Sequence, residues 1–263
     1  MILEAALAVT TFAQAWKASD INEKALNTLK KAHNTHADAV ALFQRHKEDA
    51  DKSLVKLINR KKAILSNRMP QFISVYQQIR AIDFQPGDGI LELYSNNLSV
   101  RDVEEIKLMA VTAQKPMSEQ ELAVEYLITG VGGMFVADAK RNAAIANSQQ
   151  QIANALYSQA ETLVIAVDAI GKRAEQIARL LSQLSLLFGQ CTEATEEIIL
   201  RNGSNRVRYS KTDREVLMNC VNLASAVKAV LDVPILNADG SVTEASLVAL
   251  QEGEARLQKF RIQ

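Results

Sequence analysis

AEQIARLLSQLSLLF, residues Ala174–Phe188, carries apolar side chains that alternate in steps of three and four. The same steps continue backward along the chain to about Ile152. This spacing keeps one line of side chains facing a neighbouring helix. We call this line the apolar seam, and its large members are Leu156, Leu163, Val167, Ile170, Ile177, Leu181, Leu184 and Phe188. The seam predicts a long helix with coiled-coil-like contacts, used within the chain, between copies, or both.

A second long periodic segment precedes the seam. From about Ser19 to Ile82, apolar residues recur at steps near three and four, which indicates a helix rather than a strand. Pro70 should end or kink this helix near Met69, because proline has no amide hydrogen and clashes with the preceding turn. Residues 20–68 hold 11 lysines and arginines against 6 acidic residues, so this helix is basic.

Composition favours an all-α fold. The chain has 10 glycines and 4 prolines in 263 residues, which leaves few turns for a sheet protein. Two long helices in one chain predict an antiparallel hairpin. We therefore expect a single elongated helical bundle over residues 1–263, built on a hairpin of long coiled-coil-like helices with shorter helices packed alongside. Its expected parts are a first helix and the long basic helix (1–82), a short helical insert (83–117), the long heptad helix (118–202) and C-terminal helices (203–263).

Four helix starts are predicted from pairs in which a hydroxyl and a carboxylate three residues later cap backbone amides. These pairs are Ser99 with Asp102, Ser118 with Glu121, Thr212 with Glu215, and Ser241 with Glu244. The first pair starts a shorter helix that carries Val103, Ile106, Leu108 and Met109. DFQPGDG, residues 83–89, is the first clear turn, and the long heptad helix should end at about Asn202 or Gly203.

EYLITGVGGMFVADAKRN, residues Glu125–Asn142, places Gly130, Gly132 and Gly133 within four positions of a helical sequence. A phosphate-binding loop would follow a strand and often carry a lysine beside its last glycine, and neither is present. Glycine in a helix costs about 1 kcal/mol relative to alanine. We therefore predict that the three glycines allow a tight helix contact or a bend. The alternative is a hinge or a membrane-facing tip, because residues 126–137 are uncharged.

MILEAALAVTTFAQAW, residues 1–16, is apolar apart from Glu4. It has neither the basic leader nor the cleavage site of a signal peptide, and it is shorter than the roughly 20 residues that cross a bilayer. We expect a first helix packed on the core; the alternative is a helix that docks on a membrane or a partner. Cys191 and Cys220 are expected to be reduced, buried thiols of a cytoplasmic protein, with a single disulfide as the alternative.

Groups with catalytic or metal-binding potential are few. The histidines are His33, His36 and His46, and no acidic residue stands one turn from both of the first two. The sequence has no Glu-x-x-His pair and no Gly-x-Ser-x-Gly motif. We therefore expect no enzymatic activity, no metal and no cofactor.

A basic patch follows the long heptad helix. With Tyr209 alone for base stacking and a net charge of zero, the sequence argues against nucleic-acid binding. The patch consists of Arg201, Arg206, Arg208, Lys211 and Arg214.

Two resemblances bear on function. The alanine- and glutamine-rich heptads of residues 174–188 resemble chemoreceptor signalling hairpins in composition. The layout of long helices around an apolar glycine segment is similar to that of helical pore-forming toxins, which implies conditional membrane association through residues 1–16 and 126–137. We expect a non-enzymatic interaction or scaffold protein that forms a homo-oligomer, with a dimer favoured, or that binds another helical protein. Membrane association is the alternative function, and a ligand-binding helical domain is the third.

Overall fold

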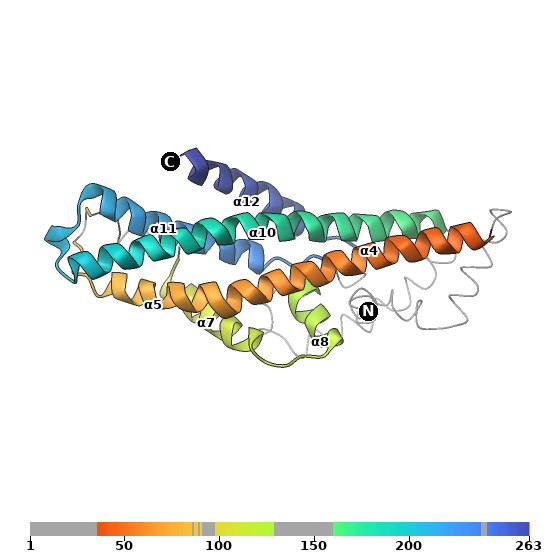
Figure 1. Cartoon of the computed structure of the whole chain (residues 1–263), viewed down its shortest axis with the longest axis horizontal. Coiled ribbons are helices and arrows are strands. Elements are labelled where there is room, and N and C mark those ends of the chain that lie inside the picture. Colours follow the sequence, from red (N-terminus) through yellow and green to blue (C-terminus); the bar gives the residue numbers. More distant parts are fainter. Residues whose placement is uncertain are drawn as a thin grey trace. The chain divides into compact units, whose positions relative to one another are not determined.

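The computed structural model describes residues 36–85, 87–88, 90, 98–128, 160–237 and 241–262. These residues are mostly helical (Figure 1). The α-helices are α4 (His36–Ala63), α5 (Met69–Arg80), α7 (Val100–Ala113), α8 (Glu119–Ala123), α10 (Ala160–Asn202), α11 (Lys211–Leu231) and α12 (Glu244–Ile262). Two π-helical turns, η1 (Ile64–Arg68) and η2 (Val124–Ile128), and a 3-10 turn, η4 (Arg206–Arg208), complete the set. The described residues form no strand, only an isolated bridge between Leu236 and Val242, so the all-α prediction is confirmed.

Pro70 changes the hydrogen-bonding pattern of its helix without stopping it. The helix passes from α4 into the π-turn η1 and resumes as α5, with Pro70 in the first turn of α5. The amide of Met69 donates to the carbonyl of Ile64, five residues back. A π-turn is one way in which a helix accommodates an irregularity. The irregularity predicted near Met69 is therefore present, but it lies just before the proline.

The chain divides into two compact units, each made from three separate stretches. Unit 1 contains residues 1–59, 116–178 and 232–250, and unit 2 contains residues 60–115, 179–231 and 251–263. Three of the five boundaries between these stretches fall within helices, namely within α4, α10 and α12. The prediction of one domain over the whole chain stays a prediction.

In unit 1, α4 lies against the first part of α10 (Figure 1). His46 of α4 contacts Asp168 of α10 through its Nδ1 atom. One turn further along both helices, a Cβ atom built on Gly171 would lie 3.0 Å from the Cα of Ala50. Because residue numbers rise together along the two helices, they run in the same direction here. The antiparallel hairpin predicted for the two long helices is not what these residues form.

An antiparallel hairpin does occur in unit 2, between the second part of α10 and α11. Residues 203–210 connect the two helices. Arg201 pairs with Asp213 near the connection, at 2.7 Å. Further from it, the Thr192 hydroxyl lies 3.7 Å from the Cys220 sulfur. The short connection explains why adjacent helices pair in this way.

Aromatic rings mark the core of unit 2. The ring centroids of Phe72 on α5 and Phe188 on α10 are 5.3 Å apart, and both side chains are fully buried. Phe72 also lies 5.7 Å from Tyr76, whose hydroxyl donates to the carbonyl of Leu98. Contact between aromatic rings adds to the free energy gained by burying them. Phe188 belongs to the apolar seam, so the seam contributes the α10 side of this core.

Two of the four predicted helix starts are confirmed and two are misplaced by two residues. Ser99 with Asp102 and Ser118 with Glu121 form reciprocal capping contacts. Before α11, Ser210 with Asp213 makes these contacts in place of Thr212 with Glu215. Before α12, the Thr243 hydroxyl accepts from the Ser246 amide, while the predicted Ser241 bonds with Asn237.

Candidate interaction surface

The apolar seam is covered by the chain's own side chains. Each of its described members is at most 1% exposed, namely Val167, Ile170, Ile177, Leu181, Leu184 and Phe188. The burial predicted from the heptad spacing is thus observed at these positions. Leu156 and the side chain of Leu163 lie outside the described residues. Since the described seam is out of contact with water, a binding partner would have to use another face.

Helix α7 presents apolar side chains to water. Val100, Leu108 and Val111 are 51%, 48% and 58% exposed. At about 100° per residue they fall within an arc of roughly 80° on the helix. The opposite side of α7 is buried in unit 2 through Val103, Ile106, Met109 and Ala110. Of the four apolar residues that the sequence analysis assigned to this helix, Val103, Ile106 and Met109 are buried and Leu108 is exposed.

Charged residues lie within this exposed face of α7. The Lys107 ammonium bonds to the Glu104 carboxylate at 2.5 Å, one turn away on the same helix. Beside the face, Arg101 pairs with Glu105 at 3.3 Å. An interface that also exists free in water is only about as apolar as the rest of a protein surface, so these charges are compatible with binding at this face.

The same helix is anchored to α11 by a lysine. The Lys228 ammonium lies 3.2 Å from the Glu105 carboxylate and 3.6 Å from the Asp102 carboxylate. Burial acts to raise the pKa of Asp102, but hydrogen bonds from Ser99 and the charge of Lys228 hold that pKa below its ordinary value. These contacts fix the orientation of α7, so its exposed face is a defined surface.

Other large apolar side chains that are exposed in the described residues are more dispersed. On α10 they are Ile165, Leu186 and Leu200, which are spaced at least 14 positions apart in the sequence. Polar residues separate them along the helix. Leu247 and Val248 on α12 and Val207 on η4 are the remaining ones. Scattered exposed apolar residues are common on soluble proteins, whereas a cluster is not.

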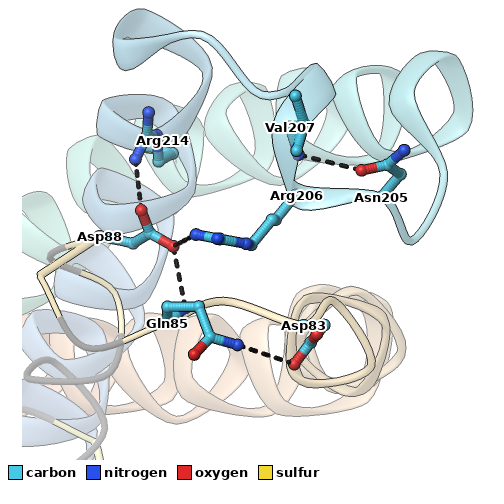
Figure 2. Close-up of polar contacts among 7 residues, drawn as sticks. All are labelled: Asp83, Gln85, Asp88, Asn205, Arg206, Val207 and Arg214. Carbon is cyan, nitrogen blue, oxygen red and sulfur yellow. Dashed lines mark hydrogen bonds and ion pairs between the residues drawn. The ribbon is translucent and has the colours of Figure 1, made fainter.

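The predicted basic patch is largely paired with carboxylates. Arg214 lies 2.7 Å and Arg206 3.4 Å from the carboxylate of Asp88. This carboxylate also accepts a hydrogen bond from the backbone amide of Gln85 at 2.9 Å (Figure 2). The hydrogen bond from the Gln85 backbone amide has the largest effect and lowers the pKa of Asp88. Burial acts to raise this pKa, and the charges of Arg214 and Arg206 lower it further. Asp88 thus joins the turn after α5 to the loop before α11.

The rest of the basic patch follows the same pattern. Arg201 pairs with Asp213 at 2.7 Å, and Lys211 lies 3.8 Å from Glu215. Arg208 is exposed. Positive charges that already face carboxylates have less to gain from a phosphate. The sequence could not reveal these partners, because Asp88 lies more than 100 positions before the two arginines that it binds.

The two cysteines are free thiols of unit 2 that interact with each other. Cys220 on α11 is buried, and Cys191 on α10 is half-buried. Their mutual hydrogen bond raises the pKa of Cys191, with burial adding to the rise, and lowers the pKa of Cys220. The expectation of buried, reduced thiols fits Cys220 fully and Cys191 in part.

Several predicted features lie outside the described residues. These are residues 1–16, the glycines Gly130, Gly132 and Gly133, and His33. Within the uncharged segment 126–137, the described residues Tyr126 and Leu127 are buried in unit 1. The Leu127 carbonyl accepts hydrogen bonds from the amides of Ile235 and Leu236 at 2.6 and 2.8 Å. This end of the segment is therefore part of the protein core.

No protein-family model, curated protein or solved structure matches this chain. In the part of the chain that the structure describes, no helix combines the length and apolarity needed to cross a bilayer. No three metal-binding side chains gather at one place among those same residues. The function is therefore argued from the surface, and the exposed face of α7 is its most distinctive feature.

Proposed function

We propose that this chain is a non-enzymatic, cytoplasmic helical interaction protein that associates with itself as a dimer. The observation that carries the proposal is the exposed apolar face of α7. Val100, Leu108 and Val111 lie together on the water side of a helix whose other side is packed in unit 2. Removing apolar surface from water stabilises an association by about 25 cal/mol per Å² before the costs of binding. Symmetric dimers are the commonest oligomers of soluble proteins, so a second copy of the chain is the partner we favour.

The buried seam has a supporting role in this proposal. Long helices with coiled-coil-like packing give a stiff frame on which a short helix can be held for binding. The elongated bundle expected from the sequence belongs to the same proposal. A second helical protein that covers α7 is the other partner of this class.

The mass of the protein in solution tests the proposal. Light scattering behind a sizing column should give twice the 28.9 kDa chain mass at micromolar concentration and above. Val111→Asp should shift the protein to the monomer, because it places a charge in the apolar face. Ile165→Asp is the matched control, since Ile165 is also exposed, at 68%, but lies on α10. A monomer at every concentration of the unaltered protein would refute self-association.

Membrane association through residues 1–16 and 126–137 is the alternative proposal. Flotation with liposomes distinguishes it from the first, because a dimer formed through α7 stays with the soluble fraction. Recovery of the unaltered protein with the vesicles would favour the membrane alternative.

A further inference from the structure

The exposed face of α7 contains a short heptad stripe of its own. Val100, Glu104, Lys107 and Val111 follow each other at steps of four, three and four. At about 100° per residue, the four positions fall within an arc of roughly 60°, so they form one line along the helix. We call these four residues the α7 stripe. Leu108 lies beside the stripe and widens its apolar surface.

The α7 stripe is complementary to itself in one orientation. If two copies of α7 cross antiparallel at the middle of the stripe, each Val100 faces Val111 of the second copy. Each Glu104 then faces Lys107 of the second copy, and every contact occurs twice. In the parallel orientation like charges would meet, with Glu104 against Glu104 and Lys107 against Lys107. Facing charges of opposite sign favour one orientation over the other.

We propose that α7 pairs antiparallel with α7 of a second copy of this chain, with Val100 against Val111 and Glu104 against Lys107. This pairing rests on the self-association proposed above and names the surface that produces it. Helix α7 has 14 residues, or about 21 Å at 1.5 Å per residue. A contact of this length lies at the small end of specific interfaces. The dimer is therefore in micromolar exchange with the monomer.

The two charged positions allow a test that separates pairing from folding. Glu104→Lys makes both charged positions of the stripe basic, and Lys107→Glu makes both acidic. Either change places like charges opposite each other twice in the dimer, and we expect the dimer dissociation constant to rise at least about tenfold. The double variant Glu104→Lys with Lys107→Glu restores opposite charges across the interface, so it should dimerise like the unaltered protein.

An equimolar mixture of the two single variants gives the sharpest measurement. One variant presents two basic positions and the other presents two acidic ones. The mixture should therefore form a heterodimer at concentrations at which neither variant forms a homodimer. Sedimentation velocity over a range of concentrations measures all four proteins and the mixture. At concentrations low enough for the unaltered protein to be monomeric, thermal unfolding of each single variant should match it, because the pair within α7 is exposed and such pairs contribute little.

The possible results separate the two proposals. If the unaltered protein dimerises and both single variants still dimerise equally well, the antiparallel α7 pairing is overturned while self-association stands. If the mixture of single variants associates no better than either alone, the pairing is also overturned. A monomer at every concentration of the unaltered protein rejects both. Weakened single variants, a restored double variant and a heterodimer in the mixture support the pairing.

Discussion

Replacing Gly171 tests the close approach of α4 and α10 in unit 1. A Cβ atom at this position would lie 3.0 Å from the Cα and 3.2 Å from the Cβ of Ala50. The first of these neighbours belongs to the backbone of α4, so it cannot rotate out of the way. The glycine therefore has a packing reason to stand in the interior of a 43-residue helix.

Two opposing effects set the size of the change at Gly171. Alanine in a helix interior is favoured over glycine by about 1 kcal/mol, whereas overpacking a core costs about 1–3 kcal/mol. Gly171→Ala should therefore lower the free energy of unfolding by about 0–2 kcal/mol. Gly171→Leu adds more atoms with no further gain in helix propensity, so its cost should approach about 3 kcal/mol.

Urea denaturation followed by far-ultraviolet circular dichroism measures these free energies. Ala169→Leu is the matched control, because Ala169 is exposed on the same helix and should change stability by less than about 0.5 kcal/mol. If Gly171→Ala instead stabilises the protein by the full propensity gain, α4 and α10 do not touch at this point and the reasoning is wrong.

Three other changes test a helix start, the apolar seam and a carboxylate of α7. Ser210→Ala should lower the free energy of unfolding by about 1 kcal/mol, while Thr212→Ala should change it little, because Ser210 caps α11; urea denaturation in which Thr212→Ala is the costlier change would contradict the observed start. Ile170→Asp should cost about 3–5 kcal/mol, because it buries a charge without a partner; unchanged thermal unfolding would disprove that burial. The folded state holds the pKa of Asp102 below its unfolded value, so the carboxylate stabilises the fold above about pH 4 and loses this effect as the pH falls through the folded pKa. The unaltered protein should therefore lose stability more steeply below about pH 4 than Asp102→Asn, and parallel stability curves would show that the Lys228 and Ser99 contacts do not form.

Features set by neighbouring residues in the sequence were predicted well. The heptad spacing identified Ile170, Ile177 and Phe188 as buried, since a 3-4 repeat requires a covered face. The sequence also predicts the end of α10 at about Asn202 or Gly203, and the helix ends at Asn202. Gly203 follows with a left-handed backbone, at a φ of 64°, as is common for a glycine after a helix. Both conclusions depend on chemistry within a few positions along the chain.

Helix starts show the limit of such local patterns. The segment before α11 holds two capping pairs offset by two residues, Ser210 with Asp213 and Thr212 with Glu215. Both satisfy the local rule for a capping box. The structure uses the first, in which Asp213 also pairs with Arg201 from the end of α10. The local sequence does not decide between the two capping pairs, and the pair that forms is the one whose carboxylate also contacts the neighbouring helix.

The interaction surface depends even more on contacts distant in sequence. In α7, Leu108 stands next to the buried Met109, and an apolar pattern alone does not reveal which side meets the core. In the folded chain the other side of α7 is buried, and Lys228 from α11 lies close to Asp102 and Glu105. The exposure of Val100 and Val111 therefore follows from the packing of α7 in unit 2, which the local sequence does not show.

Close contacts at glycines also depend on residues that are distant in the sequence. The sequence predicts a tight helix contact at Gly130, Gly132 and Gly133, because glycines clustered in a helix must have their cost offset. These residues lie outside the described part of the chain, so the contact stays a prediction. Gly171 has no other glycine near it in the sequence, yet its missing side chain leaves room for the backbone of Ala50. A close approach needs only one residue without a side chain, provided that a neighbouring helix passes that point. Since the position of the neighbour is a property of the fold, the sequence around Gly171 could not reveal this contact.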